Sequence, residues 1–426
     1  MADWFLERRE VRDSVHVRSG LRLQAPLTEK GWASCRSLAG GVEWRWADLP
    51  GDKVPPGELP SEVAARGESL LAPPPLRSAP DEAVEAALLH LVETARAAGA
   101  SHLEILLREV DRGALFHGHD RQTEDRQRHA LLEFKAFHTE GGTSVDAWRC
   151  SAFPDTDQLL ADLPALSARV EAMVRALRES APVQPCPTGA LPIVFPPGAA
   201  SACFFHEVCG HPLEGDVVAR GGSYLAHRRG QRVAGEHVSV SDDPTDAHGA
   251  LTFAWDDEGH AARPVPLLRG GIVGTPLVDT RSAAVLGLAC NGHGRRVSYR
   301  HPPLARMGHT RVEPHQGRLE TLMADVPHGL LVQHLTPRHM NLLSGDFSFY
   351  VVEAREIRDG HLGRRVSPGI LRGNGLEALA AIDAVGEDVS NLFATRGCRK
   401  LDHGPLPVSF GQPSIRFRQL YVEPWR

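Results

Sequence analysis

The chain has 426 residues, 42% of them hydrophobic and 23% charged, which is long enough for two globular domains with their own cores. Its net charge of −6 excludes a basic protein that binds nucleic acid through its overall charge. No stretch approaches the ~20 apolar residues of a membrane span, and charged residues interrupt residues 1–9 before the core of a signal peptide can form. We therefore expect a cytoplasmic protein without a nucleic-acid or membrane partner.

The first 180 residues predict a mixture of strands and helices. Residues 11–23 alternate between apolar and polar side chains, as strands do. Residues 81–98 predict a helix, because their apolar side chains recur on one face and Gly99 follows as a C-terminal stop signal. Residues 103–110 predict another strand, a hairpin-like region follows, and residues 166–177 predict a second amphipathic helix.

Two proline-rich stretches divide the chain, at residues 50–80 and 182–187. Proline lacks a backbone donor and restricts the residue before it, so neither stretch is expected in a helix or a central strand. The second stretch predicts the main domain boundary. We expect an N-terminal α/β domain at residues 1–181, a Pro-rich linker at residues 182–190 and a β-rich domain at residues 191–426.

The second half of the chain predicts mostly β-structure. A short apolar strand at residues 191–195 precedes a helix at residues 199–210 that is rich in small side chains. Beyond Asp216, short β-like runs alternate with Gly, Pro, Asp and Asn, and residues 376–385 give the one clear later helix. The expected fold class is therefore α+β, with an N-terminal α/β domain followed by a β-rich domain built on a curled or barrel-like sheet.

The strongest local signal for chemistry is the sequence His-Glu-Val-Cys-Gly-His at residues 206–211. Two close imidazoles with a carboxylate beside the first are typical of a metallopeptidase site. Neutral imidazoles bind zinc, and the glutamate takes a proton from the metal-bound water. His206 and His211 are therefore candidate zinc ligands, and Glu207 is the candidate general base.

The spacing of the two histidines differs from that of His-Glu-x-x-His, in which they lie four residues apart on one helix face. Five residues place His206 and His211 roughly 140° apart on a regular α-helix. Because Gly210 and Pro212 favour a helix end, we expect the helix to stop at Gly210 and His211 to swing back toward the metal. Cys209, three residues after His206, is a rival ligand on an undistorted helix.

A third ligand must come from elsewhere, because a catalytic zinc normally has three protein ligands and one open position. Cys398 is attractive, since basic residues surround it and nearby cations favour the thiolate that binds a metal. Seven cysteines without an export signal argue against a disulfide framework. Spacing alone leaves several candidates open: Cys398, Cys290, His260, His293, His403 and several acids.

Five short blocks of sequence lie in order along the C-terminal half. They are residues 206–216, with His-Glu-Val-Cys-Gly-His and its Leu-Glu-Gly-Asp tail, 256–259 (Asp-Asp-Glu-Gly), 291–296 (Asn-Gly-His-Gly-Arg-Arg), 344–349 (Ser-Gly-Asp-Phe-Ser-Phe), and 397–400 (Gly-Cys-Arg-Lys) with 407–413. Together they resemble the TldD/PmbA family of cytoplasmic metallopeptidases, specifically its catalytic TldD-like branch. The order of the five blocks is more specific than any one block.

The resemblance implies a set of roles. His206, His211 and Cys398 would hold one Zn²⁺ per chain and Glu207 would be the base, while Cys209 would be no ligand. The family fold is an N-terminal α/β domain followed by a β-rich domain. Members degrade or trim unstructured peptides, including ribosomally made peptide natural products, and often work as a heterodimer with a related subunit that lacks the metal motif.

We therefore predict a zinc-dependent peptidase that hydrolyses unstructured or modified peptides, with maturation of a ribosomally made peptide natural product as one such role. The alternatives are a non-catalytic peptide-binding partner subunit and a metal-dependent amide hydrolase with a small substrate. We expect an extended peptide to dock along a β edge. Arg296 or His293 is the candidate oxyanion donor, and Glu214 and Asp216 are candidates for orienting the histidines. Arg399 departs from the family pattern, which usually has glycine there, so we expect a less flexible loop around the cysteine.

Overall fold

The computed structural model describes residues 2–17, 20–38, 41–49, 59–71, 75–140, 143–179, 183–198, 203–247, 249, 251–400 and 402–425. Within these ranges the strands form two seven-stranded sheets, a six-stranded sheet and a two-stranded sheet. Residues 50–58 and 72–74 of the first proline-rich stretch, Pro182 and residues 199–202 lie outside the described residues, so the predictions made for them are not addressed. Elsewhere in the first stretch the expectation of no helix is wrong: Ser61–Leu71 form a helix, because this run contains no proline. The linker at residues 182–190 and the domain limits on either side stay predictions.

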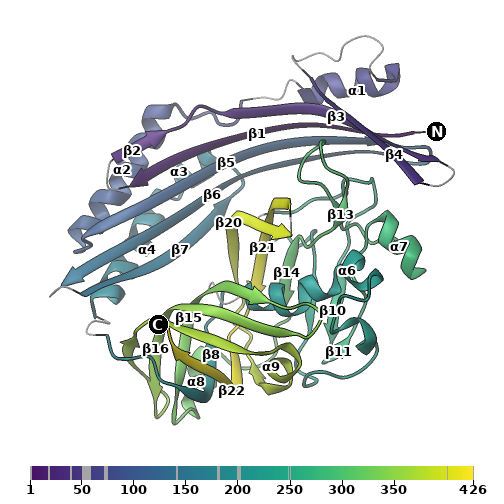
Figure 1. The fold of residues 1–426 in the computed structure, drawn as a ribbon. Helices are drawn as coiled ribbons and strands as arrows, with labels where there is room; N and C mark the ends of the chain where they lie inside the picture. Colours follow the sequence, from purple (N-terminus) through teal and green to yellow (C-terminus); the bar gives the residue numbers. More distant parts are fainter. Residues whose placement is uncertain are drawn as a thin grey trace.

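One long, antiparallel sheet forms the N-terminal half, and we call it the N-terminal sheet (Figure 1). Its strand order is β4-β3-β1-β5-β6-β7, with β2 beside β1. Buried and half-buried residues alternate along the first part of β5, because successive side chains point to opposite faces of a sheet. The strands are β1 (Asp3–Val17), β2 (Gly20–Leu23), β3 (Leu27–Leu38), β4 (Gly41–Asp48), β5 (His102–His117), β6 (Gln122–Glu140) and β7 (Thr143–Phe153).

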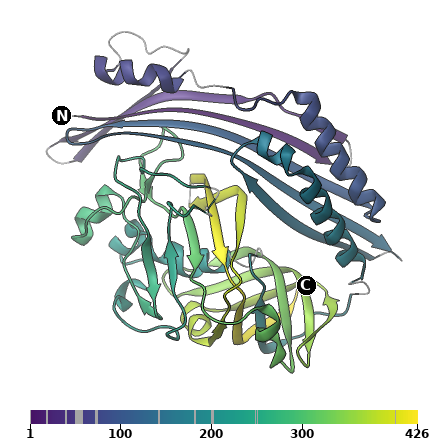
Figure 2. The ribbon, with the colours of Figure 1, turned by 180° about the vertical axis from the view of Figure 1, so that it is seen from behind.

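Four helices accompany this sheet, and they lie on its face away from the C-terminal half (Figures 1 and 2). They are α1 (Ser61–Leu71), α2 (Asp81–Ala97), α3 (Thr156–Ala161) and α4 (Leu163–Glu179). Helix α2 begins with two acidic residues and is followed by Gly99 at φ 100°, a conformation that favours glycine. The apolar faces of α2 and α4 form one buried cluster with the sheet, which confirms both helix predictions.

The C-terminal half contains a closed barrel. Five strands pair in the order β15-β8-β22-β18-β16, and β16 pairs back with β15, so the ring has no open edge. Strands β17 and β19 extend it. This arrangement confirms the α+β class with a barrel-like sheet. The strands are β8 (Gly189–Phe195), β15 (His328–Met340), β16 (Asp346–Arg358), β17 (His361–Val366), β18 (Gly369–Asn374), β19 (Ile382–Val385) and β22 (Ile415–Pro424).

A six-stranded sheet lies between the barrel and the N-terminal sheet (Figure 1). Its order is β11-β10-β9-β14-β21-β20, which makes β20 an edge strand. The strands are β9 (Val240–Asp242), β10 (Val265–Arg269), β11 (Ile272–Val273), β14 (His309–Val312), β20 (Ser390–Lys400) and β21 (His403–Gln412). The two-stranded sheet pairs β12 (Gly294–Arg295) with β13 (Leu304–Ala305).

The helices of the C-terminal half are short: α5 (Cys203–Phe205), α6 (Gly215–Ala219), α7 (Thr280–Leu286), α8 (Leu319–Ala324) and α9 (Gly375–Ala381). The predicted helix at residues 376–385 is wrong in its second part, because residues 382–385 form β19. Helices α7 and α8 were not predicted, since six or seven residues are too few to show helical periodicity. No helix in the described ranges is long and apolar enough to cross a membrane.

A buried network of charges joins the two halves. Arg112 on β5 pairs with Glu7 on β1 at 2.6 Å and with Asp257 of the C-terminal half at 2.8 Å. The backbone N–H of Tyr299 donates to the same Glu7 at 2.7 Å. Glu7 is 1% exposed, so removing one partner would leave a buried charge without compensation. The network fixes the N-terminal sheet against the C-terminal half.

Candidate metal centre

The two candidate histidines lie where a helix widens by one residue per turn. Helix α5 continues into a π-helical turn at His206–Gly210, and the backbone N–H of His211 donates to the carbonyl of His206. A hydrogen bond between residues five apart places those residues one above the other. The predicted helix break at Gly210 is therefore wrong: Gly210 has helical dihedral angles, with φ −65° and ψ −66°.

Tight packing explains why the turn contains glycine and how it is held. A Cβ atom on Gly210 would lie 1.9 Å from the Sδ atom of Met307. Within the turn, the Tyr224 hydroxyl donates to the backbone carbonyl of Val208 at 2.5 Å. This bond satisfies a carbonyl that the hydrogen-bond pattern of the π-helical turn leaves available. Glycine is needed here for close approach rather than for an unusual dihedral angle.

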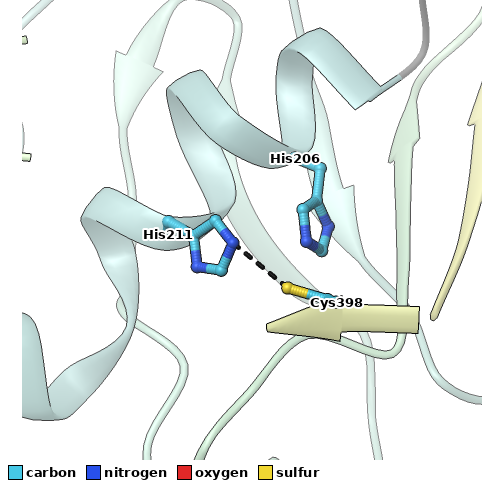
Figure 3. A group of neighbouring side chains, drawn as sticks. All are labelled: His206, His211 and Cys398. Atoms are coloured by element: carbon cyan, nitrogen blue, oxygen red, sulfur yellow. Dashed lines mark hydrogen bonds between the residues drawn. The ribbon is translucent and has the colours of Figure 1, made fainter. Parts of the chain in front are cut away.

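Three side chains converge at this turn (Figure 3). The His206 and His211 ring centroids are 4.8 Å apart. Cys398, which reaches them from β20, has its Sγ atom 3.2 Å from Nε2 of His211. One ligand atom from each of the three residues lies within 4.8 Å of the other two. The structure thus brings together the three residues that the family resemblance implied, across 187 positions of sequence.

The donor set fits a zinc ion. All three side chains are buried, and Nε2 of His206 has no hydrogen-bond partner in the described part of the chain. A buried ring nitrogen without a partner is unfavourable, and a metal ion at that point would satisfy it. Two imidazoles and a thiolate are a donor set that zinc favours, and they leave a fourth position open. The role of the three as ligands stays a prediction.

A hydrogen-bonded chain orients His206. Its Nδ1 lies 3.3 Å from Oγ1 of Thr310, and that hydroxyl donates to Oδ2 of Asp242 at 2.8 Å. Asp242 is fully buried, and its other oxygen accepts from the backbone N–H of Gly308 and lies 3.1 Å from Nε2 of His293. Because the threonine proton points to Asp242, its oxygen accepts from Nδ1–H of His206. The lone pair of Nε2 then faces Cys398.

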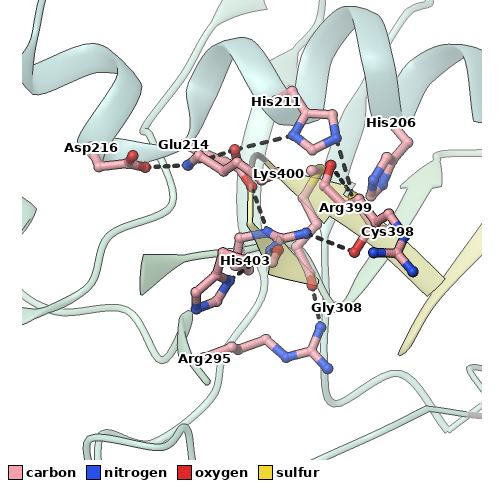
Figure 4. Close-up of polar contacts among 12 residues, drawn as sticks. His206, His211, Glu214, Asp216, Arg295, Gly308, Cys398, Arg399, Lys400 and His403 are labelled. Atoms are coloured by element: carbon pink, nitrogen blue, oxygen red, sulfur yellow. Dashed lines mark hydrogen bonds and ion pairs between the residues drawn. The ribbon is translucent and has the colours of Figure 1, made fainter. Parts of the chain in front are cut away.

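A second network orients His211, and Figure 4 shows it. Oε2 of Glu214 lies 3.1 Å from Nδ1 of His211 and 2.9 Å from Nζ of Lys400, while Oε1 lies 3.2 Å from Nε of Arg306. Burial opposes the ionisation of Glu214, but His211, Lys400 and Arg306 together lower its pKa to about 2. The predicted contact of Glu214 with the histidine is present. Asp216 pairs with Lys400 instead.

The thiol of Cys398 lies in an environment that favours the thiolate. Burial alone would raise its pKa, but the electrostatic interaction with the neighbouring His211 and His206 outweighs burial and holds that pKa well below the usual value. The sequence had suggested the flanking cations for this role. Lys400 is engaged by Glu214, and Arg306 donates to the backbone carbonyl of Cys398 at 3.2 Å. The histidines, and not the flanking cations, favour the thiolate.

Glu207 lies between the candidate ligands and a cavity of about 640 Å³, which His206, Glu207 and Cys398 line together. Its Oε1 atom is 4.0 Å from Nε2 of His211. Burial raises the pKa of Glu207, while His211 and His206 act in the opposite direction. A carboxylate with a raised pKa can both accept and return a proton near neutral pH.

The opposite wall of this cavity comes from the N-terminal sheet. Trp148 on β7 stacks on His334 of β15, with ring centroids 5.1 Å apart, so the two halves meet at the rim. Strands β1, β5 and β6 supply the rest of that wall. Its residues are Val15, His16, Val17, Glu104, Ile105, Leu106, Glu133, Lys135 and Trp148.

The other candidate ligands lie elsewhere. Cys209 is fully buried in the apolar core behind the turn. His260 contacts Thr280, and His403 contacts Arg306. Cys290 is half-buried, and neither it nor these three side chains belongs to the group that could hold a metal in the described ranges.

The expected oxyanion donors are also displaced from the cavity. Arg296 lies between the rings of Phe5 and Trp44, at 4.7 Å and 4.5 Å from their centroids. His293 is fully buried beside Asp242. Neither is among the described residues that line the cavity, so this expectation is wrong.

Sequence reasoning missed Thr310, Asp242 and Arg306. Thr310 is 104 positions from the histidine that it orients and 68 from Asp242. Each is a common residue type without a local motif, so no signal in a single sequence identifies them. Lys400 was noticed, but for its effect on the cysteine and not on Glu214.

The sequence is similar to known metallopeptidases. Residues 188–423 match the model of a family described as the PmbA/TldA metallopeptidase C-terminal domain. A metalloprotease TldD homolog of Buchnera aphidicola (Schizaphis graminum) is 32% identical over 236 residues, which cover 55% of this chain and 48% of that protein. A zinc metalloprotease TldD homolog of Saccharolobus solfataricus is 27% identical over 270 residues, covering 63% and 57%. The chain spans about half the length of the curated relatives it matches.

The fold is similar to solved structures over nearly the whole chain. The crystal structure of TldE from Thermococcus kodakarensis superposes with a TM-score of 0.79 at 17% identity, covering 99% of this chain and 96% of that one. At that identity the likeness concerns the fold alone. It includes the N-terminal half, which the family model does not reach.

Proposed function

The chain belongs to the PmbA/TldD family of metallopeptidases, and on that basis we propose that it is a zinc-dependent peptidase acting on unstructured or modified peptides. The observation that carries the proposal is the convergence of His206, His211 and Cys398 beside Glu207, at the wall of one cavity. Relatives named as metalloproteases support the reaction class.

The proposed mechanism assigns a separate task to each side chain. A zinc ion held by His206, His211 and Cys398 would supply Lewis acidity and an open coordination position. Glu207 takes a proton from the attacking water and passes it to the leaving amine. Thr310 and Glu214 keep the two imidazoles in the orientation that this chemistry requires.

The size of the cavity supports a peptide substrate without a fold of its own. A volume of about 640 Å³ is in the range of small-molecule sites and accepts only a few residues of a chain. Precursors of ribosomally made peptide natural products meet this requirement, and we propose them as one class of substrate. A base placed beside the ligand set favours an enzyme over a non-catalytic peptide binder.

We also infer that the chain works with a second, related subunit. The likeness of its fold to TldE supports this inference, since the family resemblance implies a pair of unlike subunits. Co-expression followed by size-exclusion chromatography would test it, and a monomer that cleaves peptides at full rate would contradict it.

The decisive experiment compares Glu207→Gln with the unchanged protein. Both should hold about one zinc per chain, measured by atomic absorption, because Glu207 is no ligand. Cleavage of an unstructured peptide should fall by about 10²- to 10⁴-fold, the usual contribution of a general base. A chelator should abolish the remaining cleavage, and added zinc should restore it.

The matched control is Glu377→Gln, an exposed glutamate on α9, which should change neither zinc content nor rate. Glu207→Gln protein that cleaves at the rate of the unchanged protein would contradict the mechanism. Cleavage of small amides but of no peptide, alone or with the second subunit, would favour the amide hydrolase.

A further inference from the structure

A β-bulge directs a second side chain of β20 toward the cavity. Cys398 pairs with Leu406 and Lys400 with His403, and the register shifts between these two pairs. A bulge leaves a residue out of the ladder and redirects its side chain. Arg399 lies at that shift, and it lines the same cavity as Cys398 although the two residues are adjacent in the strand.

The guanidinium of Arg399 is exposed and has no hydrogen bond or ion pair with any described residue. The neighbouring cations differ in this respect. Arg306 contacts Glu214. Lys400 contacts Glu214 and Asp216 (Figure 4). Among the described residues of the cavity wall, Lys135 also carries a positive charge, but it lies 3.3 Å from Asp146. Arg399 therefore brings to the cavity a guanidinium that has no ion-pair partner among the described residues.

From this placement we infer that Arg399 binds a carboxylate of the substrate beside the bond that is cleaved. The planar guanidinium matches a carboxylate with two parallel hydrogen bonds, which no neutral side chain does. Three glutamates, Glu104, Glu133 and Glu207, also line the cavity, so an acidic substrate would be repelled without a compensating cation. The carboxylate is either the C-terminal α-carboxylate of the peptide or an Asp or Glu side chain.

This inference rests on the proposed peptidase function, but its test does not require cleavage. Fluorescein-labelled peptides are titrated into zinc-loaded Glu207→Gln protein, and the dissociation constants are measured by anisotropy. One pair of peptides differs only in a free or amidated C-terminus, and a second, amidated pair differs only in one internal Glu or Gln. The same titrations are repeated with proteins that carry a second substitution besides Glu207→Gln, either Arg399→Ala or Arg399→Lys. The control carries Arg229→Ala as its second substitution, because Arg229 is an exposed arginine outside the cavity lining.

We expect the acidic member of one pair to bind about 10- to 100-fold more tightly than its neutral partner, as charge-assisted hydrogen bonds do. Arg399→Ala should abolish that preference, Arg399→Lys should keep part of it, and Arg229→Ala should keep all of it, with zinc content unchanged throughout. The pair that shows the preference identifies the source of the carboxylate.

The inference is overturned if neither acidic peptide is preferred, if no peptide binds, or if the preference survives Arg399→Ala. Cleavage by the protein with Glu207 intact is scored separately. A charge preference without cleavage would contradict the proposed peptidase while leaving the carboxylate site in place.

Discussion

The N-terminal sheet and the C-terminal half face each other across one cavity but contribute different kinds of residue to it. The C-terminal half supplies the candidate ligands, the candidate base and the buried networks that orient them. The N-terminal sheet supplies a wall of apolar and charged side chains, and its residues precede the segment that the family model matches. We infer that the chemistry depends on the C-terminal half and the choice of substrate on both. Substitutions in the two regions should therefore have separable effects.

The largest effect is expected for Cys398→Ala. Loss of one of three ligands should take the zinc content from about one per chain to near zero and lower peptide cleavage by more than about 10³-fold. Metal analysis and initial rates measure both quantities. Cys209→Ala is the matched control from the same half. Because Cys209 lies in the apolar core, this substitution should lower the stability of the fold but leave the zinc content unchanged. Unchanged zinc in Cys398→Ala would remove this residue from the ligand set.

A smaller effect is expected for Thr310→Val. The valine keeps the volume but not the hydrogen bond that orients His206, so zinc affinity should fall by about 10- to 100-fold. Competition with a chelator of known affinity measures the change.

The control for this substitution lies in the N-terminal half. Thr156 donates to the buried Glu109 at 2.5 Å, and Thr156→Val should lower the unfolding temperature without changing zinc affinity. If both valine variants lose zinc equally, the effect is one of general stability and not of orientation.

Trp148→Ala should separate binding from catalysis. The indole forms part of the wall and stacks on His334, so its removal should raise KM about 3- to 10-fold with kcat and zinc content unchanged. Trp46→Ala, an exposed tryptophan on β4 outside the cavity lining, is the control. A fall in kcat without a change in KM would show that the wall takes part in the chemical step.

The smallest effect on cleavage is expected for His129→Leu, in the N-terminal sheet. Burial, with help from Arg9 and Arg108, lowers the pKa of His129 to about 3. The unfolded chain takes up a proton below pH ~6.5 and the folded chain does not, so stability is lost as the pH falls. Between pH 8 and pH 5 this amounts to about 2 kcal/mol.

His129→Leu should lack that part of the acid destabilisation and leave peptide cleavage at neutral pH unchanged. Urea unfolding of the unchanged protein and of His129→Leu, each at pH 8 and at pH 5, measures the loss of stability in each. Equal losses of stability in both would show that His129 is protonated in the folded protein.

The two halves also differ in how far their sequences revealed their structures. Helices α2 and α4 were predictable because long apolar faces show their period, and the motif at residues 206–211 was predictable because its residues are adjacent. Strands β9 to β14 have two to five residues, which is too short for a period to appear. The orienting residues Thr310 and Asp242 meet only through the fold.

The candidate third ligand shows the same limit. Spacing left Cys398 as one of several candidates, and the family resemblance singled it out. The oxyanion donors were misplaced because Arg296 and His293 serve the packing of the two halves and the support of the site. Charge and position in the sequence do not distinguish these uses from catalysis.

The π-helical turn limits which insertions and deletions the site can accept. Removing one residue from positions 208–210 would restore the backbone hydrogen bonds of a regular α-helix, between residues four apart. It would also bring the two histidines to the spacing of His-Glu-x-x-His. The same deletion would shift Gly210 away from Met307, where no larger residue fits, and would break the bond from Tyr224 to Val208. The length of this turn is therefore set by the core behind it as much as by the candidate ligands in front of it.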